Sequence, residues 1–391
     1  MSNPTKKSIE YIATITKLDE CVLFLNTQSE LAFDFEFDSN RFRYGYTLCL
    51  IQICAGSRCF IIEPFEFDSE ELAPVFKIFE DKKILKIVHS GGEDLRILQR
   101  LGYQAKNLFD TQVAAQFLGH EKTSLGNVLQ QVLEIELDKK QQDSNWVKRP
   151  LSPEQIKYAA NDVLYLSELR EKLLDELSGK NELDWFNEEM AHLNNFTFLE
   201  EKKDPISRDD RKAFSVVELF ILRGLLEFRE SVAKNLNRPV YQIFKDDYAR
   251  EIVREPLILR DWPSNKQSLT NLRNLDFQHR IQDEYYHLKK EAETYDFSKN
   301  PDVQPRQDGE LRMTPQKRQE NELKYLAVFK PLKDSLSEDY NVFIANNVLS
   351  RDTAMQLIGK YKKIADILPT YKQKLILDTA SKIGFDLNGY L

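Results

Sequence analysis

Short apolar segments rich in β-branched and aromatic residues characterise the first 90 residues of the chain. Each is followed by polar or turn-forming residues, a pattern that is typical of strands. The predicted strands are residues 31–37, 47–54, 59–63 and 84–89. Helical spacing of apolar residues predicts helices at 69–79, 92–101, 111–118, 124–133 and 153–177. Together they predict an α/β domain with a mixed sheet over roughly residues 8–180.

The pattern changes after residue 185, where no further strand is predicted. A charged stretch with a proline at 200–211 is typical of a linker, and a second polar stretch follows at 296–315. Helical spacing around these two stretches predicts two small all-α domains, which are similar enough in outline to suggest a diverged repeat. Their predicted helices are residues 216–236, 248–253, 269–274, 278–294, 321–336, 350–359 and 371–383.

Composition is ordinary for a multidomain globular protein: 391 residues, 41% of them apolar and 30% charged. No signal-peptide pattern and no run of 18 apolar residues occurs, so we expect a cytoplasmic protein that does not bind a membrane. The four cysteines form no CxxC pair and lie near no histidines at ligand spacing. We expect reduced, packed thiols, and neither a zinc site nor disulfides.

Charge is distributed unevenly along the chain. Residues 1–200 contain 22 Lys and Arg against 33 Asp and Glu, whereas residues 201–391 contain 33 against 30. The acidic half is therefore the better candidate for holding cations, and the second half for contacting phosphates, unless the charges are simply a solvated surface.

Two carboxylates alternate with aromatic residues in the predicted strand 31–37. Asp34 and Glu36 project from one face of the strand, and the phenylalanines between and beside them from the other. Ionised carboxylates at this spacing in an apolar strand repel each other unless a cation neutralises them, which is why metal sites use such pairs. An exposed strand with two solvated acids is the other interpretation.

A third acid follows the predicted strand 84–89. A glycine pair after His89 permits a tight turn, and the next helix carries Glu93 and Asp94 in its first turn. From there Asp94 can point back toward the sheet, although an acid at this position can also simply complement the helix dipole. His89 is expected to be structural.

The predicted helix 153–177 carries Tyr158 and Asp162 on one face, one turn apart. The small residues Ala159 and Ala160 between them would let this helix approach the sheet closely. A tyrosine–aspartate pair on the surface is the alternative.

The order and spacing of these segments resemble the ribonuclease D family and, more broadly, the tyrosine-bearing branch of the DEDD superfamily of 3′→5′ exonucleases. Its D-x-E, mid-domain aspartate and Y-x₃-D motifs match FDFEF, HSGGEDL and YAAND, and the similarity continues through LCLIQIC, LFDTQVAAQFLG and LDKKQQDSNWVKRPLSPEQIKYAANDVLYL. The resemblance implies a supporting role for Asp110 in FDTQ. It also implies four metal-binding and catalytic carboxylates and a fifth catalytic group: Asp34, Glu36, Asp94, Asp162 and Tyr158.

The resemblance further implies an order of domains. An exonuclease domain with a ribonuclease H-like mixed sheet flanked by helices is expected at 1–200, followed by two all-α HRDC-like domains, the second diverged. Two departures from the family pattern are Phe35, where a small or hydroxylated residue is usual, and Asn145, where an aspartate is usual. The expected ranges after residue 200 are a linker at 201–211, the first helical domain at 212–295, a second linker at 296–317 and the second helical domain at 318–391.

Carboxylates without histidine or cysteine ligands suit hard divalent cations, Mg²⁺ or Mn²⁺, and two ions are expected. The resemblance implies that Asp34 contacts both ions, that Glu36 and Asp162 complete one site, and that Asp94 holds the second ion largely through water. Tyr158 is expected to orient the attacking water, because a phenol with a pKa of about 10 is a poor base.

The expected partner is RNA with a free 3′ end, in particular tRNA precursors, bound by a monomer that releases 5′-mononucleotides. Basic residues of the predicted helix 216–236 and its end are candidates for backbone contacts, or else form a solvated face. Two other functions are kept open. One is a 3′→5′ exodeoxyribonuclease in DNA repair, which would use the same metal site. The other is a catalytically silent RNA-binding protein, and the intact acids argue against it. The basic candidates are Arg223, Arg229, Lys234 and Arg238.

Overall fold

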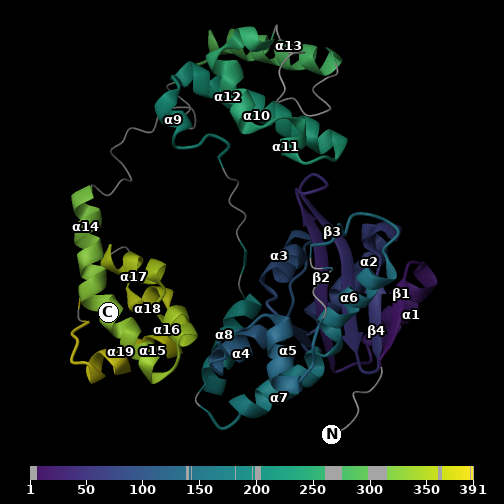
Figure 1. The fold of residues 1–391 in the computed structure, drawn as a ribbon, viewed down its shortest axis with the longest axis vertical. Helices are drawn as coiled ribbons and strands as arrows, with labels where there is room; N and C mark the ends of the chain where they lie inside the picture. Colours follow the sequence, from purple (N-terminus) through teal and green to yellow (C-terminus); the bar gives the residue numbers. More distant parts are fainter. Residues whose placement is uncertain are drawn as a thin grey trace.

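A mixed six-stranded sheet flanked by helices is followed by two groups of helices (Figure 1), which confirms the predicted fold class. This architecture comes from a computed structural model. The residues that it describes are 7–137, 141, 143–180, 182–195, 197–198, 204–259, 275–297, 315–359, 363–387 and 389–390.

The sheet has the strand order β1-β4-β3-β2-β5-β6. Strands β2, β3 and β4 form an antiparallel meander, and the other neighbours pair in parallel. The four predicted strands are present, whereas β1 and β6 were not predicted because each is short and lacks a clear alternating pattern. The strands are β1 Ser8–Ile12, β2 Glu30–Ser39, β3 Tyr46–Ala55, β4 Arg58–Ile62, β5 Leu85–Val88 and β6 Leu108–Asp110.

The two faces of the sheet bury separate apolar cores. Phe33 and Phe35 lie in the core beneath the helices α1, α2 and α3, and Leu50 and Cys54 in the core beneath α6. The four cysteines are free and buried, as expected. The helices of this part are α1 Ile15–Leu25, α2 Ser69–Glu80, α3 Gly92–Arg100, α4 Thr111–Phe117, α5 Leu125–Leu133, α6 Pro153–Leu164, α7 Leu166–Leu177 and α8 Glu182–Asn195.

The prediction of a single helix at 153–177 is wrong, because the chain forms two helices that are separated at Tyr165. Helix α6 packs across β2, β3 and β4, whereas α7 packs mainly on α4 and α5 and only touches β5 and β2. The two halves of the segment thus bury their apolar residues against different partners, which a continuous apolar pattern does not reveal. The start of α6 follows the expected pattern, with Ser152 accepting a hydrogen bond from the Gln155 amide and Pro153 in the first turn.

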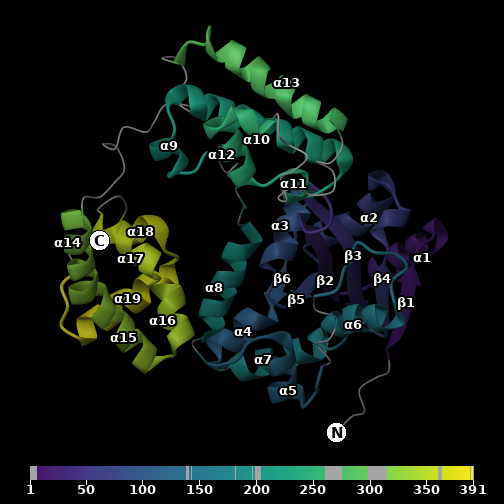
Figure 2. The same ribbon diagram turned by 45° about the horizontal axis from the view of Figure 1, so that its top comes forward.

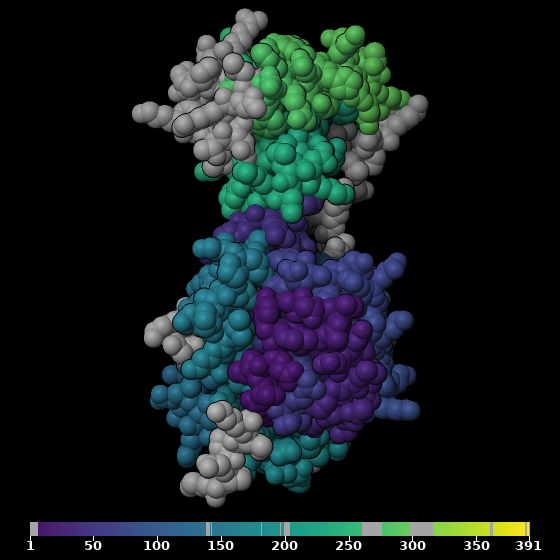
Figure 3. Space-filling view, turned by 90° about the vertical axis from the view of Figure 1, so that its right-hand side faces the viewer, coloured from purple at the N-terminus to yellow at the C-terminus, as the bar shows by residue number. Residues whose placement is uncertain are grey.

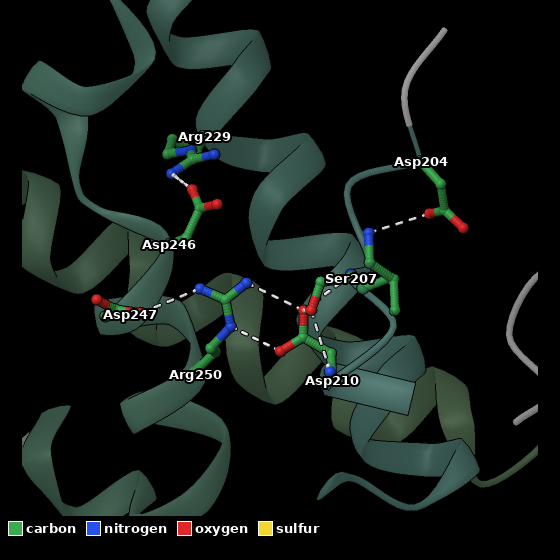
Figure 4. Close-up of polar contacts among 8 residues, drawn as sticks. Asp204, Ser207, Asp210, Arg229, Asp246, Asp247 and Arg250 are labelled. Carbon is green, nitrogen blue, oxygen red and sulfur yellow. Dashed lines mark hydrogen bonds and ion pairs between the residues drawn. The ribbon is translucent and has the colours of Figure 1, made fainter. Parts of the chain in front are cut away.

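The first helical group begins with residues that we expected in a linker. Asp210 is buried and accepts hydrogen bonds from Arg250 at 2.6 and 3.0 Å and from the Ser207 amide at 2.9 Å (Figure 4). Residues 204–211 therefore pack on this group, and the exact domain boundaries stay predictions. The predicted helical piece 269–274 lies outside the described residues. The helices are α9 Asp210–Ala213, α10 Val216–Leu236, α11 Val240–Ile243, α12 Asp246–Arg254, the 3-10 turn η2 Pro256–Leu259 and α13 Leu275–Ala292.

The second helical group lies beside α4 and α8 (Figures 1 and 2). The rings of Phe117 and Phe343 pack with their centroids 5.7 Å apart, and the Tyr371 hydroxyl donates a hydrogen bond to Glu189 at 2.7 Å. None of the helices in the described ranges is both long and apolar enough to span a bilayer. The helical segments are α14 Pro315–Lys324, the π-helical turn η7 Tyr325–Phe329, α15 Lys330–Asp339, α16 Val342–Val348, α17 Arg351–Ile358, α18 Ile364–Ile367 and α19 Thr370–Lys382.

Candidate active site

Strand β2 presents Asp34 and Glu36 on the face that α6 covers. Phe33 and Phe35 are almost fully buried on the opposite face, which confirms the predicted alternation. Asp34 lies opposite Gln52 of β3, and the register of β2 and β3 shifts directly after Glu36. The two carboxylates therefore project side by side from one face of a central strand of the sheet.

Helix α6 brings Tyr158 and Asp162 to the same place. Ala159 and Ala160 are completely buried, so the helix approaches β2, β3 and β4 closely. One carboxylate oxygen each of Asp34, Glu36 and Asp162 can lie within 4.8 Å of the others. Residues separated by more than a hundred positions thus form one acidic group.

Asp94 reaches this group from the first turn of α3. Its carboxylate accepts a hydrogen bond of 2.9 Å from the backbone amide of Phe35. Pairing between β2 and β5 ends at Ala32 and Ile87, so Asp94 takes the place of a strand partner where β2 extends beyond β5. Its position at the edge of the sheet agrees with the geometry that we predicted.

A cavity of about 300 Å³ joins all five predicted site residues. Asp94 is not among the three carboxylates that lie within 4.8 Å of one another. The structure gathers the five side chains, and their catalytic roles stay predictions. The lining residues are Asp34, Phe35, Glu36, Phe37, His89, Ser90, Glu93, Asp94, Leu125, Tyr158 and Asp162.

Electrostatics make this group of carboxyls a good fit for a cation. Burial, followed by the charge of Asp162, raises the pKa of Asp34 well above its usual range. Burial and the neighbouring carboxylates do the same to Glu36 and Asp94, and burial raises the pKa of Asp162 to about 7. All the donors are carboxylate oxygens, which hard divalent cations prefer. A bound cation would also reduce the repulsion between the ionised carboxylates.

Sequence comparison assigns the chain to a family. A family model described as 3′-5′ exonuclease matches residues 9–178. The chain is 34% identical over 257 residues to ribonuclease D of Desulfotalea psychrophila, which covers 63% of this chain and 67% of the relative. It is 30% identical over 283 residues to ribonuclease D of Granulibacter bethesdensis, covering 70% and 69%. The chain belongs to the ribonuclease D family. It is a ribonuclease D-like 3′→5′ exonuclease, as the motifs predicted.

A solved ribonuclease D structure has the same fold as this chain. The Escherichia coli structure is 21% identical to it, with a TM-score of 0.64, and the match covers 96% of this chain and 99% of the other. The likeness includes both the exonuclease part and the helical part, so the whole described architecture is that of the family.

Tyr158 lines the carboxylate cavity, and its phenol has a raised pKa. Burial, followed by the charges of Asp162 and Glu36, raises its pKa. A phenol that resists ionisation cannot serve as a general base near neutral pH, but it can donate a hydrogen bond. Its ring packs near that of Trp146, with 6.1 Å between centroids, which restricts where the hydroxyl can point.

Asp110 and His89 hold the turn that precedes Asp94. The Asp110 carboxylate accepts hydrogen bonds of 3.0 Å from the amides of both Ser90 and Gly91, besides capping α4. The His89 ring contacts the Thr111 hydroxyl and the Thr123 carbonyl, each at 2.9 Å. Asp110 thus has the supporting position that the resemblance implied, and both ring nitrogens of His89 are occupied, as expected for a structural histidine.

Gln52 is a neighbour of the site that we did not predict. It is fully buried opposite Asp34, with 3.5 Å between its Nε2 and the Asp34 carboxylate, and its Oε1 has no partner in the described part of the chain. A buried unpaired amide oxygen is costly, whereas the amide nitrogen of the same side chain faces the Asp34 carboxylate. The available signal was a lone polar residue in the apolar run LCLIQIC.

Arg149 anchors the segment that leads into α6. It pairs with the buried Glu63 at 2.8 Å and donates to the Cys49 and Trp146 carbonyls at 2.7 and 2.6 Å. Asn145, in the same segment, accepts a hydrogen bond of 3.1 Å from the Val147 amide. An aspartate would accept the same bond, so this departure from the family pattern preserves the local turn.

Two of the four basic residues proposed for RNA contact form ion pairs within the first helical group. Arg229 is buried and binds Asp246 at 2.6 Å and the Phe244 carbonyl at 2.9 Å (Figure 4). Arg223 binds Asp204 at 2.8 Å. The prediction of Arg229 as an RNA contact is wrong, because its buried guanidinium holds the helical group together. Arg223 is only partly buried, and its role in RNA contact stays a prediction. Lys234 and Arg238 are exposed.

Proposed function

We propose that the protein removes 5′-mononucleotides from the 3′ end of structured RNA, with two divalent cations, Mg²⁺ or Mn²⁺, and with tRNA precursors as the leading substrate class. The observation that carries this proposal is the cavity where Asp34, Glu36 and Asp162 converge, with Asp94 and Tyr158 in its wall. Membership of the ribonuclease D family supports the reaction class.

The five predicted site residues have different tasks in this proposal. Asp34, Glu36 and Asp162 would hold the cations, with Asp94 completing the second position. When bound, the cations supply the positive charge that a scissile phosphate and an ionising water require. Tyr158 donates a hydrogen bond that orients the attacking water, since its pKa is raised and it keeps its proton.

RNA as the substrate is supported by a relative. The Escherichia coli ribonuclease D structure carries the description of an exoribonuclease involved in structured RNA processing. In this chain, the exposed Lys234 and Arg238 near the end of α10 are available for a backbone phosphate. A single-stranded 3′ tail is the part of a structured RNA that could enter the carboxylate cavity.

The test is release of 5′-mononucleotides from a 3′-tailed RNA hairpin, with matched DNA alongside, in Mg²⁺, Mn²⁺ or EDTA. Replacement of the shared ligand, Asp34→Asn, should lower kcat/KM by a factor of about 1,000 or more. Asp175→Asn, at an exposed aspartate of α7, should leave the rate unchanged. Undiminished metal-dependent release by Asp34→Asn would refute the site, and equal or faster hydrolysis of DNA would refute RNA as the substrate.

A further inference from the structure

The loop between β2 and β3, residues 40–45, begins shortly after Glu36 and is closed by its own hydrogen bonds. Asp38 accepts from the amides of Phe42 at 3.1 Å and Arg43 at 2.8 Å. Asn40 accepts from the Gly45 amide at 2.7 Å, and both residues have positive φ, of 60° and 70°. The conformation of this loop is therefore coupled to the end of the strand that carries the catalytic carboxylates.

Two residues of the loop form part of a second cavity, of about 230 Å³. This cavity shares Glu36 and Phe37 with the carboxylate cavity, so the two adjoin. Aromatic rings and one arginine, whose guanidinium lies 5.0 Å from the Phe42 ring centroid, suit a nucleotide, because bases stack on such surfaces and Arg binds phosphate. The lining residues are Glu36, Phe37, Asp38, Ser39, Arg41, Phe42, Ser144 and Trp146.

The first helical group holds the outer side of the same loop. The Tyr241 hydroxyl of α11 donates to the Arg41 carbonyl at 2.7 Å. The Tyr44 hydroxyl donates to Glu230 of α10 at 2.7 Å, and the Tyr44 amide to Asn237 at 3.3 Å. The Tyr44 ring also packs against the apolar core of the group.

The figures show how the two parts meet. The loop at the top of β2 and β3 reaches α11 in Figure 1, and the first helical group meets the nuclease part across a narrow waist in Figure 3. Arg41 and Phe42, which line the second cavity, therefore lie between the carboxylate site on one side and the helical group on the other. A shift of this group would move the wall of the cavity.

We propose that Tyr44 and Tyr241 are positioning residues for RNA hydrolysis, through which the first helical group fixes Arg41 and Phe42 beside the carboxylates. This inference rests on the proposed exoribonuclease function and extends it, since it gives the helical group a part in forming the nucleotide site. The physical reason is entropic: a loop held on both sides presents its arginine and ring to the substrate without first having to be ordered.

The experiment removes the two hydroxyls and keeps the rings, in the double variant Tyr44→Phe/Tyr241→Phe of the full chain. On a short single-stranded RNA, KM should rise about three- to tenfold, since each lost hydrogen bond has a modest net effect, while kcat and Mn²⁺ affinity stay within about twofold. Hydrogen exchange of the amides of residues 41–44 should quicken. Tyr286→Phe, at an exposed tyrosine of α13, is the matched control and should match the wild type in every measurement.

A second variant tests the contact without touching a tyrosine. Asn237 caps α10 with a φ of 50°, which glycine adopts readily. Asn237→Gly should keep the cap, remove the acceptor of the Tyr44 amide and raise KM in the same direction. The inference is overturned if Tyr44→Phe/Tyr241→Phe has the same KM and exchange rates as the control Tyr286→Phe. It is also overturned if the double variant loses kcat and Mn²⁺ affinity as strongly as its KM rises. A wild type that leaves RNA intact overturns the proposed function itself, which distinguishes the two failures.

Discussion

Three carboxyl groups, those of Asp34, Glu36 and Asp162, lie close together in the carboxylate cavity. The Asp162 pKa of about 7 lies above the ordinary aspartate value because the group is buried. A carboxyl whose pKa is raised in the folded state stabilises that state at low pH, and this contribution is lost as the pH rises through about 7. A bound cation stabilises the ionised form and offsets the free-energy cost of ionising a buried carboxyl, so metal binding and proton release are linked.

We expect Mn²⁺ to bind at least about tenfold more tightly at pH 8 than at pH 6, because a carboxyl with a pKa of about 7 is mostly protonated at the lower pH and ionised at the higher. The raised pKa values of the neighbouring carboxyls act in the same direction. Isothermal titration calorimetry of the metal-free protein measures this directly. In Asp162→Asn, which has no proton to lose there, affinity should be weaker and the dependence on pH smaller. Equal wild-type affinities at the two pH values would contradict the linkage.

The packing of helix α6 against the sheet determines where Asp162 lies relative to Asp34. Ala159 and Ala160 lie fully buried against the sheet between Tyr158 and Asp162. The short side chains set the distance of the helix from β2, and so the distance of its carboxylate from Asp34. The same helix is anchored at its start by the segment around Arg149, which binds the buried Glu63.

Enlarging this contact in Ala160→Leu should lower the free energy of unfolding by about 1–3 kcal/mol, because the core has no room for three more carbon atoms. Mn²⁺ affinity should fall with it as Asp162 moves away from β2. Urea unfolding and calorimetry measure the two effects. The same substitution at the exposed Ala191 of α8 should change neither quantity. Unchanged metal affinity in Ala160→Leu would show that α6 does not set the carboxylate spacing.

The two helical groups contact the nuclease part in different ways. The first contacts the loop between β2 and β3 through hydrogen bonds and the ring of Tyr44, whereas the second packs several aromatic residues against α4 and α8. Phe117 is buried between Phe186 of its own domain and Phe343 of the second group. The apolar interface should keep the second group and the nuclease part together as one unfolding unit.

Removing one ring from this interface, in Phe343→Ala, should lower the free energy of unfolding by about 2–4 kcal/mol, since it leaves a cavity beside Phe117. Its neighbour Val342 is 66% exposed on the same helix, so Val342→Ala should cost less than about 0.5 kcal/mol. Urea denaturation followed by tryptophan fluorescence compares them, because Trp185 lies in the interface against Tyr340. Similar midpoints for the two variants would contradict tight docking.

The sequence by itself determined those features that depend on neighbours along the chain. Strand alternation placed Asp34 and Glu36 on one face, a helical spacing of four placed Tyr158 above Asp162, and the glycine turn before α3 placed Asp94 at the sheet edge. Each of these follows from the period of a strand or helix, or from the position of a residue in the first turn of a helix, which are local properties of the backbone. The left-handed residue of the turn before α3 is Ser90, with a φ of 62°, and not one of the two glycines.

Tertiary structure alone decided the features that depend on partners distant in sequence. It divided the helix predicted at 153–177, because α6 and α7 pack mainly against different elements, and it placed the buried Gln52 beside Asp34. It also turned Arg229 from a candidate RNA contact into the partner of Asp246. Charge and periodicity describe what a side chain can do, but burial and ion pairing depend on which other side chains the fold brings to it.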